Sequence, residues 1–355
     1  MSQAILAPVS SSDHAALADF LASFPGLQGE RDFWLSRMRL WWQDNPAFVN
    51  APAGWVLRSG NAIEGFLGNL PSLLQCNGRC LTVHSITTWM VSPKFREQSL
   101  SLLLEHIRAS EQTLLFDTTP TADVAAILES LGFVPLPWAG ERESFIMADP
   151  KRCIEAALPG PLKPLARAGA AALAPLQSLR LKALRDRGLP LSAEAHEVGA
   201  EFDHLWDRTK NLYLNTNIRT SEAVRWHCLA DPFIPKKLFV CKQDDRLAGY
   251  MIFKARARRG LTSLDCADFW EDPSGRGILE SLIAAAREHA QNQGADLLTF
   301  PHFNRGLGDR LGRAGLLERA SGRRALFLGA PKLLETIKAE NSYLVGLQGD
   351  YGTAG

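Results

Sequence analysis

Apolar and polar residues alternate with two different periods along the first part of the chain, and each period predicts a type of element. Residues 12–24 and 31–42 place apolar side chains three or four positions apart, which is typical of amphipathic helices. The segments 54–60, 62–74 and 81–91 are rich in apolar and β-branched residues and are separated by turn-forming residues. We therefore expect two helices followed by an antiparallel meander of strands.

The same periods extend to the end of the first half. They predict a helix at 97–110, a strand at 113–119, a helix at 122–132, and a pair of strands of which the last is 143–148. The following stretch, 156–175, is rich in Pro, Ala and Gly and shows no strand alternation. It is therefore typical of a connector between domains.

The second half repeats this order of elements. It begins with a strand near 189–198, continues with two helices and three strands that end near 270, and then predicts a long helix that stops near Gly294. A strand, a short helix and a final strand at 323–329 complete the copy. Two copies of one α/β unit account for the length of 355 residues.

This repetition sets the expected domain organisation. The N-terminal domain covers 1–155, the connector 156–175 and the C-terminal domain 176–340, and a Gly-rich tail covers 341–355. Each domain is expected to belong to the α/β (α+β) class, with a mixed and mostly antiparallel sheet flanked by helices.

Composition and charge narrow the class of protein. The 39 Lys and Arg residues against 38 Asp and Glu give a formal net charge of +1, so nucleic acid is not an expected partner. No apolar run approaches the ~20 residues of a membrane span, and the start of the sequence has no signal-peptide pattern. A cytoplasmic protein is therefore expected, in which the six cysteines stay reduced.

Cys76 and Cys80 flank an Asn-Gly-Arg stretch that predicts a hairpin turn. In this arrangement the two thiols can pair across the turn or bind a metal ion. Because no second pair of Cys or His residues stands nearby to complete four ligands, we expect no metal site.

One strand-to-helix corner carries a recognisable spacing. Val91, Pro93, Arg96, Ser99 and Ser101 stand at the marked positions of the pattern V-x-P-x-x-[RQ]-x-x-G-x-[GA], with serine in place of both glycines. The corner resembles the cofactor loop of the Gcn5-related N-acetyltransferase (GNAT) family, in which the central helix follows a strand.

Further stretches extend the resemblance. LESLGF at 128–133 is similar to the YEKLGF-like segment of the family. In the second half Gly275 and Gly277 keep the G-x-G spacing, although Asp272 stands where Arg or Gln is usual, and 311–316 corresponds to the LGF stretch. The chain thus resembles two GNAT domains in tandem.

The resemblance implies acetyl-CoA or a longer acyl-CoA as co-substrate, with no metal. The family's loop binds the pyrophosphate, and a helix N-terminus suits this role because its unpaired N–H groups and dipole attract an anion. Glycine permits close backbone approach, and arginine adds a charged fork. The residues expected to bind the cofactor are Val91, Arg96, Ser99, Ser101, Gly275, Arg276 and Gly277. The glycine pair favours the second half as the working one, whereas the closer match to the pattern favours the first.

N-acyl transfer needs a base for the amine and hydrogen-bond donors for the tetrahedral oxyanion. The tyrosine that the family commonly uses as an acid falls on Leu128 and Leu311, so neither half has that hydroxyl. The candidates are therefore polar residues on strands. The expected catalytic residues are Asp265, Asp268 and His302, beside the second glycine pair, and Glu64 in the first meander; His84 and Asp117 are further candidates.

Side-chain alternation along a strand decides on which face of the sheet Asp265 and Asp268 lie. Asp265 and Asp268 are three positions apart in one predicted strand, so they are expected on opposite faces, and only one of them can line a cleft.

The expected function is an acyl-CoA-dependent N-acyltransferase that acts on a small amine or amino sugar by direct transfer, without a covalent enzyme intermediate. Two alternatives stay open. Peptidyl transferase-like ligases that use aminoacyl-tRNA resemble the tandem arrangement and are expected to show a basic face with salt-dependent binding. The missing tyrosines and the serine-for-glycine changes are compatible with a degenerate, non-catalytic binding module.

Overall fold

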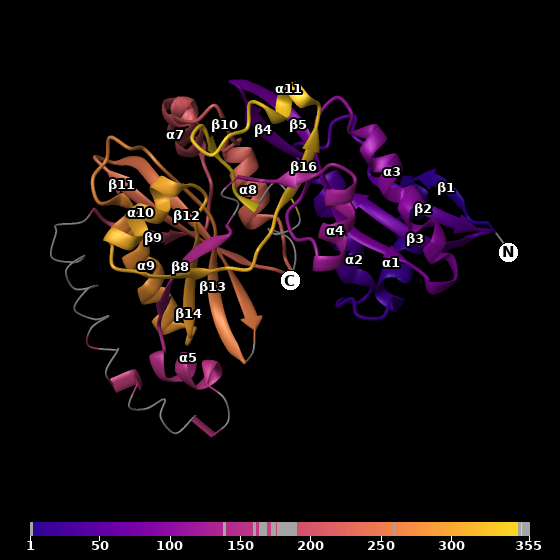
Figure 1. Ribbon diagram of the computed structural model, residues 1–355. Helices are drawn as coiled ribbons and strands as arrows, with labels where there is room; N and C mark the ends of the chain where they lie inside the picture. The colour runs from indigo at the N-terminus through magenta and orange to yellow at the C-terminus, as the bar shows by residue number, and fades with distance from the viewer. Residues whose placement is uncertain are drawn as a thin grey trace.

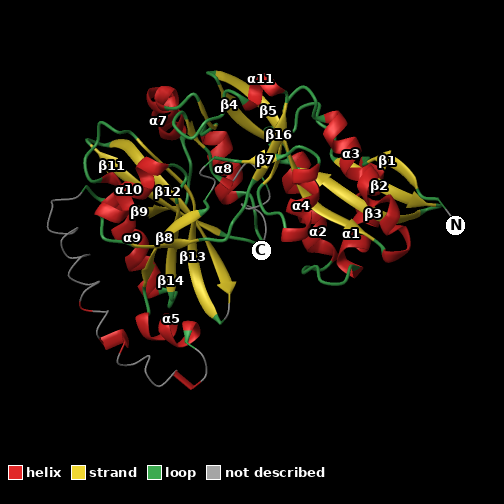
Figure 2. Cartoon of the chain, in the orientation of Figure 1, coloured by secondary structure: helices red, strands yellow, loops and turns green. Residues whose placement is uncertain are grey.

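The computed structural model contains two β-sheets with helices on their faces (Figures 1 and 2). The residues it describes are 3–137, 140–158, 161–162, 169–171, 175, 190–258, 260–346 and 349. Among these residues no helix combines the length and the hydropathy needed to cross a membrane.

The first sheet has ten strands, most of them from the first half of the chain. Its main path runs through β1 (Ile5–Pro8), β2 (Gly54–Ser59), β3 (Ala62–Asn69), β5 (Arg79–Val91), β4 (Ser72–Cys76), β10 (Asn215–Asn217) and β17 (Ser342–Tyr343). A branch from β5 continues through β6 (Leu114–Asp117), β16 (Leu326–Gly329) and β7 (Val134–Pro135). The predicted meander is confirmed, because β2, β3 and β5 pair antiparallel.

Helices cover both faces of the first sheet. They are η1 (Ser11–Asp13), α1 (His14–Ser23), α2 (Arg31–Met38), η2 (Arg39–Gln43), η3 (Pro93–Gln98), α3 (Ser99–Ala109) and α4 (Ala122–Ser130). Strand β2 shows how alternation divides them, since Trp55 and Leu57 pack with Leu102 of α3 while Val56 packs with Leu17 of α1. The sheet is therefore buried on both sides.

The second sheet has seven strands in the order β15 (Leu317–Ala320), β8 (Arg142–Met147), β14 (Leu297–Pro301), β13 (Leu261–Glu271), β12 (Arg246–Arg258), β11 (Lys236–Gln243) and β9 (Ser192–Ala195). The remaining helices are α5 (Pro150–Ala157), α7 (Ala200–Thr209), η5 (Lys210–Leu212), α8 (Ser221–Leu229), α9 (Ile278–Asn292), α10 (Arg305–Arg313) and α11 (Pro331–Leu334). The order of elements thus repeats that of the first half, as predicted.

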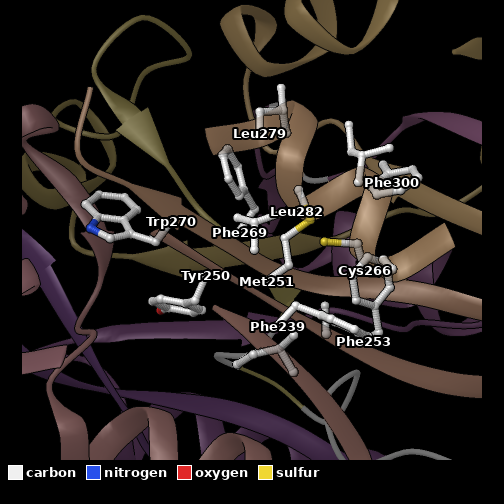
Figure 3. Close-up of a cluster of buried hydrophobic side chains, with 14 of the residues drawn as sticks. Phe239, Tyr250, Met251, Phe253, Cys266, Phe269, Trp270, Leu279, Leu282 and Phe300 are labelled. Carbon is white, nitrogen blue, oxygen red and sulfur yellow. The ribbon is translucent and has the colours of Figure 1, made fainter. Parts of the chain in front are cut away.

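The core of the second half is aromatic and aliphatic (Figure 3). Phe239, Met251 and Phe253 of β11 and β12 pack against Phe269 of β13 and Leu282 of α9, all nearly or fully buried. Burial of each such side chain contributes about 1.5–3 kcal/mol before the loss of chain entropy. One face of the sheet is therefore an apolar core.

Each sheet is closed by a strand from the other half of the chain. Strand β8, expected to complete the first half, lies between β14 and β15 of the second sheet. Strand β16, expected to complete the second half, lies between β6 and β7 of the first sheet. The expectation that each half closes its own sheet is wrong, because a short apolar strand carries no signal in its own residues for which edge it pairs with.

The start of the tail also enters the first sheet. Strand β17 pairs in parallel with β10, and β10 pairs with β4 of the first half. Residues 215–217 and 342–343 therefore join the two halves through backbone hydrogen bonds, while most of the predicted tail beyond 346 lies outside the described residues.

Candidate functional site

The first sheet opens where two parallel strands separate. β5 and β6 pair only through His84 with Leu115 and Ser85 with Phe116. Beyond Ser85, β5 keeps its ladder with β3 on one edge, while its other edge parts from β6. The free edge of β5 and the carboxyl end of β6 are the two sides of this opening.

A cavity of about 670 Å³, which we name the slot cavity, fills the opening. Its strand side consists of Ile86, Thr87, Thr88, Trp89, Met90, Asp117, Thr119, Pro120, Thr121 and Val124. Its helix side comes from the loop before α2, from α2 and from η2, and it includes Gly26, Leu27, Gln28, Gly29, Phe33, Trp34, Arg37 and Trp41. Its volume falls within the roughly 300–1,000 Å³ of ligand pockets in proteins.

The backbone of β5 is distorted inside the slot cavity. Thr88 has a φ of +51°, a left-handed conformation that β-branched residues rarely adopt. The register of β5 on β3 shifts between Phe66 and Gly68, so β5 carries one extra residue there, a β-bulge. A bulge takes backbone groups out of the ladder, and strain of this kind is typical of functional sites.

Asp117 is the one carboxylate among the described residues that line the slot cavity. It ends β6, is 5% exposed, and accepts a hydrogen bond of 3.1 Å from the backbone N–H of Thr119. Ligands of α/β proteins typically bind at the carboxyl ends of parallel strands. The position and fixed orientation of Asp117 therefore suit it to act on a ligand in this cavity.

Three buried donors on the lining side chains have no acceptor among the described residues. Arg37 donates from Nη1 to Asp231 at 2.6 Å, with both side chains 2% exposed, but its Nη2 has no partner. The Nε1 atoms of Trp34 and Trp89 also lack partners. Because buried donors are normally paired, this arrangement is typical of a site that binds a molecule with acceptor oxygens.

The predicted cofactor residues of the first corner surround the start of α3. Val91 belongs to the core beneath α3, and Arg96 is exposed on η3. Ser99 begins α3 and is half-buried, whereas the hydroxyl of Ser101 donates to the carbonyl of Gln98 at 2.6 Å. The backbone N–H of Ser99 donates to the carbonyl of Arg96, so the guanidinium of Arg96 is the part of this corner that suits an anion.

The glycines of the second corner have a packing role. Gly277 precedes α9 with a φ of +68°. A Cβ on Gly275 would collide with the side chain of Ile278 and lie 2.5 Å from Oε1 of Gln243. Gln243 also donates to the carbonyl of Arg276 at 2.9 Å, and the slot cavity does not reach this turn. Close packing and backbone conformation therefore account for both glycines.

Side chains fill the opening of the second sheet. β13 and β14 pair in parallel and then separate, as β5 and β6 do. There Arg219 donates from Nη2 to Asp268 at 3.0 Å and stacks on the ring of Trp270, with 4.2 Å to its centroid. The hydroxyl of Tyr343 donates to the carbonyl of Phe269 at 2.8 Å. The side chains of Arg219 and Tyr343 therefore pack against the part of β13 that lies beyond its pairing with β14.

This filling predicts a stability effect. Asp268→Asn would leave the buried Arg219 without its counter-charge, so the free energy of unfolding is expected to fall by about 3 kcal/mol. Urea denaturation measures this change. Asp19→Asn is the matched control, because its pair with Arg31 is exposed and is expected to contribute about 0.5 kcal/mol or less. Equal losses in the two variants would contradict a structural role for Asp268.

Asp265 and Asp268 share a face of the second sheet. On the ladder with β12, Asp268 lies opposite Ile252 and Asp265 opposite Lys254, so Ala267 is an extra residue in β13. Ile252 and Lys254 are two positions apart, so their side chains point to the same face. The prediction of opposite faces is wrong because this bulge shifts the alternation by one residue.

The structure does not bring the predicted second-half residues into one cavity. Asp265 accepts from Thr299 Oγ1 at 2.7 Å, whereas Asp268 is enclosed with Arg219. His302 is 4% exposed, its Nε2 lies 2.8 Å from Oγ of Ser144, and burial lowers the pKa of its imidazole. None of these three side chains lines the slot cavity.

Glu64 lies at the first corner rather than in the slot cavity. Its Oε2 accepts a hydrogen bond of 2.6 Å from Oγ of Ser92, just before η3. Leu128 and Leu311, at the positions of the family's tyrosine, are fully buried core residues. Sequence analysis missed Thr88 and Arg37 as site residues, because neither a positive φ nor a missing hydrogen-bond partner leaves a residue pattern.

Cys76 and Cys80 are free, the first buried and the second exposed. In the described part of the chain no group of three or more His, Cys, Asp or Glu side chains is arranged to hold a metal ion.

The arrangement of elements defines the class of fold. In each half two helices precede a run of antiparallel strands, a central helix follows the last of these, and the next strand runs parallel to it and then separates. This is the GNAT fold, and the chain contains it twice.

Solved structures show the same arrangement. N-myristoyltransferase of Saccharomyces cerevisiae, with bound myristoyl-CoA and inhibitors, is 13% identical, with 92% of this chain and 80% of that chain covered at a TM-score of 0.57. A GCN5-related N-acetyltransferase of Kribbella flavida is 13% identical, with 91% and 70% covered and a TM-score of 0.57. One from Anabaena variabilis is 12% identical, with 92% and 72% covered and a TM-score of 0.54.

No protein-family model and no curated protein sequence matches the chain. At 12–13% identity the likeness is one of fold.

Proposed function

We propose that the chain is an acyl-CoA-dependent N-acyltransferase whose working site is the slot cavity of the first half. The observation that carries this proposal is the separation of β5 from β6 around a cavity that contains a bulged strand edge and a buried carboxylate. The cavity is large enough for the thioester end of an acyl-CoA together with a small amine or amino sugar as acceptor.

Each part of the site has a role in direct transfer. The amine nitrogen attacks the thioester carbonyl, its proton passes to Asp117, the new C–N bond forms and the C–S bond breaks. N–H groups at the Thr88 bulge stabilise the oxyanion of the tetrahedral intermediate. CoA leaves as a thiolate and takes its proton from solvent, which a thiol pKa near 8.5 allows without a tyrosine acid.

We place the working site in the first half, although the glycine pair of the second half led to the opposite expectation. Arg219 and Tyr343 fill the corresponding opening of the second sheet, and Gly275 is accounted for by its packing against Ile278. The first corner keeps Arg96 exposed and a half-buried Ser99 at the start of α3, where a pyrophosphate can meet a cation and a serine hydroxyl.

Calorimetric titration with acetyl-CoA and longer acyl-CoAs tests this proposal. Arg96→Ala is expected to weaken binding by about tenfold, the equivalent of one charged hydrogen bond. Arg276→Ala, the matched change at the exposed second corner, is expected to leave the affinity unchanged. The reverse order of effects would move the site to the second half, and flat titrations of the unmodified chain would overturn the proposed function.

A further inference from the structure

A second cavity, of about 890 Å³, lies on one face of the second sheet beside α5. We name it the basic cavity. Side chains of β8, β12, β13 and β14 line it, together with α5 and the segment 319–324. Met251, Phe253 and Phe300 of the apolar core point to the other face of these strands (Figure 3), so alternation brings Lys254 and Thr299 to the cavity.

The lining of the basic cavity has an excess of positive charge. Its described cationic residues are Lys254, Arg256, Arg319, Arg323 and Arg324, and its described carboxylates are Glu143 and Asp265. Five cations against two anions leave an excess of three positive charges when the lysine is protonated. A concave site of one sign attracts ligands of the opposite sign.

The two carboxylates orient part of this charge. Glu143 accepts from Arg319 at 2.7 Å and lies 3.6 Å from Arg323, and Asp265 lies 3.3 Å from Arg323. Lys254 is 3% exposed and stands directly across the ladder from Asp265. A lysine this deeply buried is rare in proteins and marks the cavity as a candidate binding site.

The basic cavity adjoins the slot cavity. Thr119 and Pro120, in the segment between β6 and α4, line both. Asp117, the proposed base, stands two residues earlier on the same segment and lines the slot cavity. A molecule with its amine at Asp117 can therefore extend past Pro120 toward the basic residues.

We infer that the basic cavity binds the anionic group, a phosphate or carboxylate, of the acceptor whose amine is acylated in the slot cavity. The inference rests on the proposed function and narrows its acceptor to small amines that carry such a group. Lys254 and Arg256 contact the anion, and the arginines held by Glu143 and Asp265 surround it.

The protonation of Lys254 is expected to make the affinity for the anion depend on pH. The pKa of its ammonium is lowered to about 7, mainly by burial; Arg256, Lys236 and Arg323 contribute to this lowering, and Asp265 opposes it. A bound anion favours the charged form of Lys254, so binding takes up a proton at any pH at which this lysine is neutral before the anion binds. Anion affinity is therefore expected to fall as the pH rises above about 7.

Titration of the full chain with sulfate tests the site directly, because sulfate keeps its charge through this pH range. Lys254→Met is expected to weaken sulfate binding by about tenfold and to remove its pH dependence. Arg256→Gln changes a half-buried side chain, and it is expected to weaken sulfate binding even if the lysine variant fails to fold. Lys332→Met, at an exposed position outside the cavity, is the matched control.

Phosphoethanolamine and ethanolamine, titrated in the presence of acyl-CoA, test the link to the acceptor. We expect phosphoethanolamine to bind at least about tenfold more tightly, with the difference lost in Lys254→Met. Equal binding of the two amines, or sulfate binding that is unchanged in both cavity variants, would overturn the inference.

Two further outcomes have distinct meanings. Weaker acyl-CoA binding by Lys254→Met would assign the basic cavity to the phosphates of CoA itself and would overturn the inference. Failure of the unmodified chain to bind any acyl-CoA would overturn the proposed function, and the acceptor role with it, even where sulfate binding still depends on Lys254.

Discussion

Replacing Asp117 with asparagine is expected to lower kcat by ~10³-fold while the affinity for acyl-CoA stays unchanged. The amide cannot accept the proton of the attacking amine, yet it keeps the oxygen that accepts the 3.1 Å hydrogen bond from Thr119. The loss should therefore be confined to the chemical step. Steady-state kinetics with an amine that the unmodified chain acylates, combined with acyl-CoA titration, measure both quantities.

Asp123→Asn is the matched control for this experiment. Asp123 lies in the first turn of α4, six residues further along the chain, and its side chain is exposed. We expect this variant to keep the kcat of the unmodified chain. If Asp117→Asn also keeps it, or if its kcat recovers fully at higher pH, then another group accepts the proton and the assignment of the base is wrong.

Replacing Val124 with tryptophan is expected to weaken acyl-CoA binding by ~10³-fold or more, about 4 kcal/mol. Val124 is half-buried on α4 and faces the slot cavity, so an indole at this position extends into the space that the thioester end needs. Calorimetric titration measures the affinity, and circular dichroism checks that the variant stays folded.

The control for the tryptophan variant comes from the same helix. Ile127 is 40% exposed and does not line the slot cavity, so Ile127→Trp adds the same ring to α4 without entering the site. We expect it to bind acyl-CoA normally. Undiminished binding by a folded Val124→Trp protein would show that the thioester lies elsewhere.

The elements and their repetition were open to prediction because they depend on local patterns. Apolar spacing over 12–24 and 31–42 corresponds to α1 and α2, and the apolar runs of the meander correspond to β2 to β5. Register and partner choice are different, since they depend on residues far apart in the chain. Nothing within 143–148 or 323–329 indicates that each of these strands pairs in the other half's sheet.

The candidate site was only partly open to prediction. Asp117 could be named as a carboxylate at a strand end, but the glycine pair at 275 and 277 drew the expectation toward the second half. Gly275 serves the packing of Ile278, which the spacing of the glycines does not distinguish from phosphate binding. A filled opening is a property of tertiary structure, so the residue pattern gives no indication that Arg219 occupies it.

The bulge in β13 shows a second limit. Period-two alternation assumes an unbroken ladder, and one extra residue at Ala267 reverses the faces of everything beyond it. The bulge in β5 at Thr88 had no signal either, although it lies in the middle of the slot cavity. Bulges at functional sites therefore cannot be predicted from the alternation of apolar and polar residues.

The exchange of β8 and β16 has a consequence for biosynthesis. The edge of β6 that pairs with β16 has no partner until residues 326–329 have left the ribosome, so the first sheet stays incomplete while the preceding residues are translated. Ribosome-bound chains that end before this segment would expose an open strand edge. A half of the protein that is expressed alone, with its boundary in the connector, would lack the strand that completes its sheet. The synthesis of residues 326–329 thus decides when the first sheet becomes native.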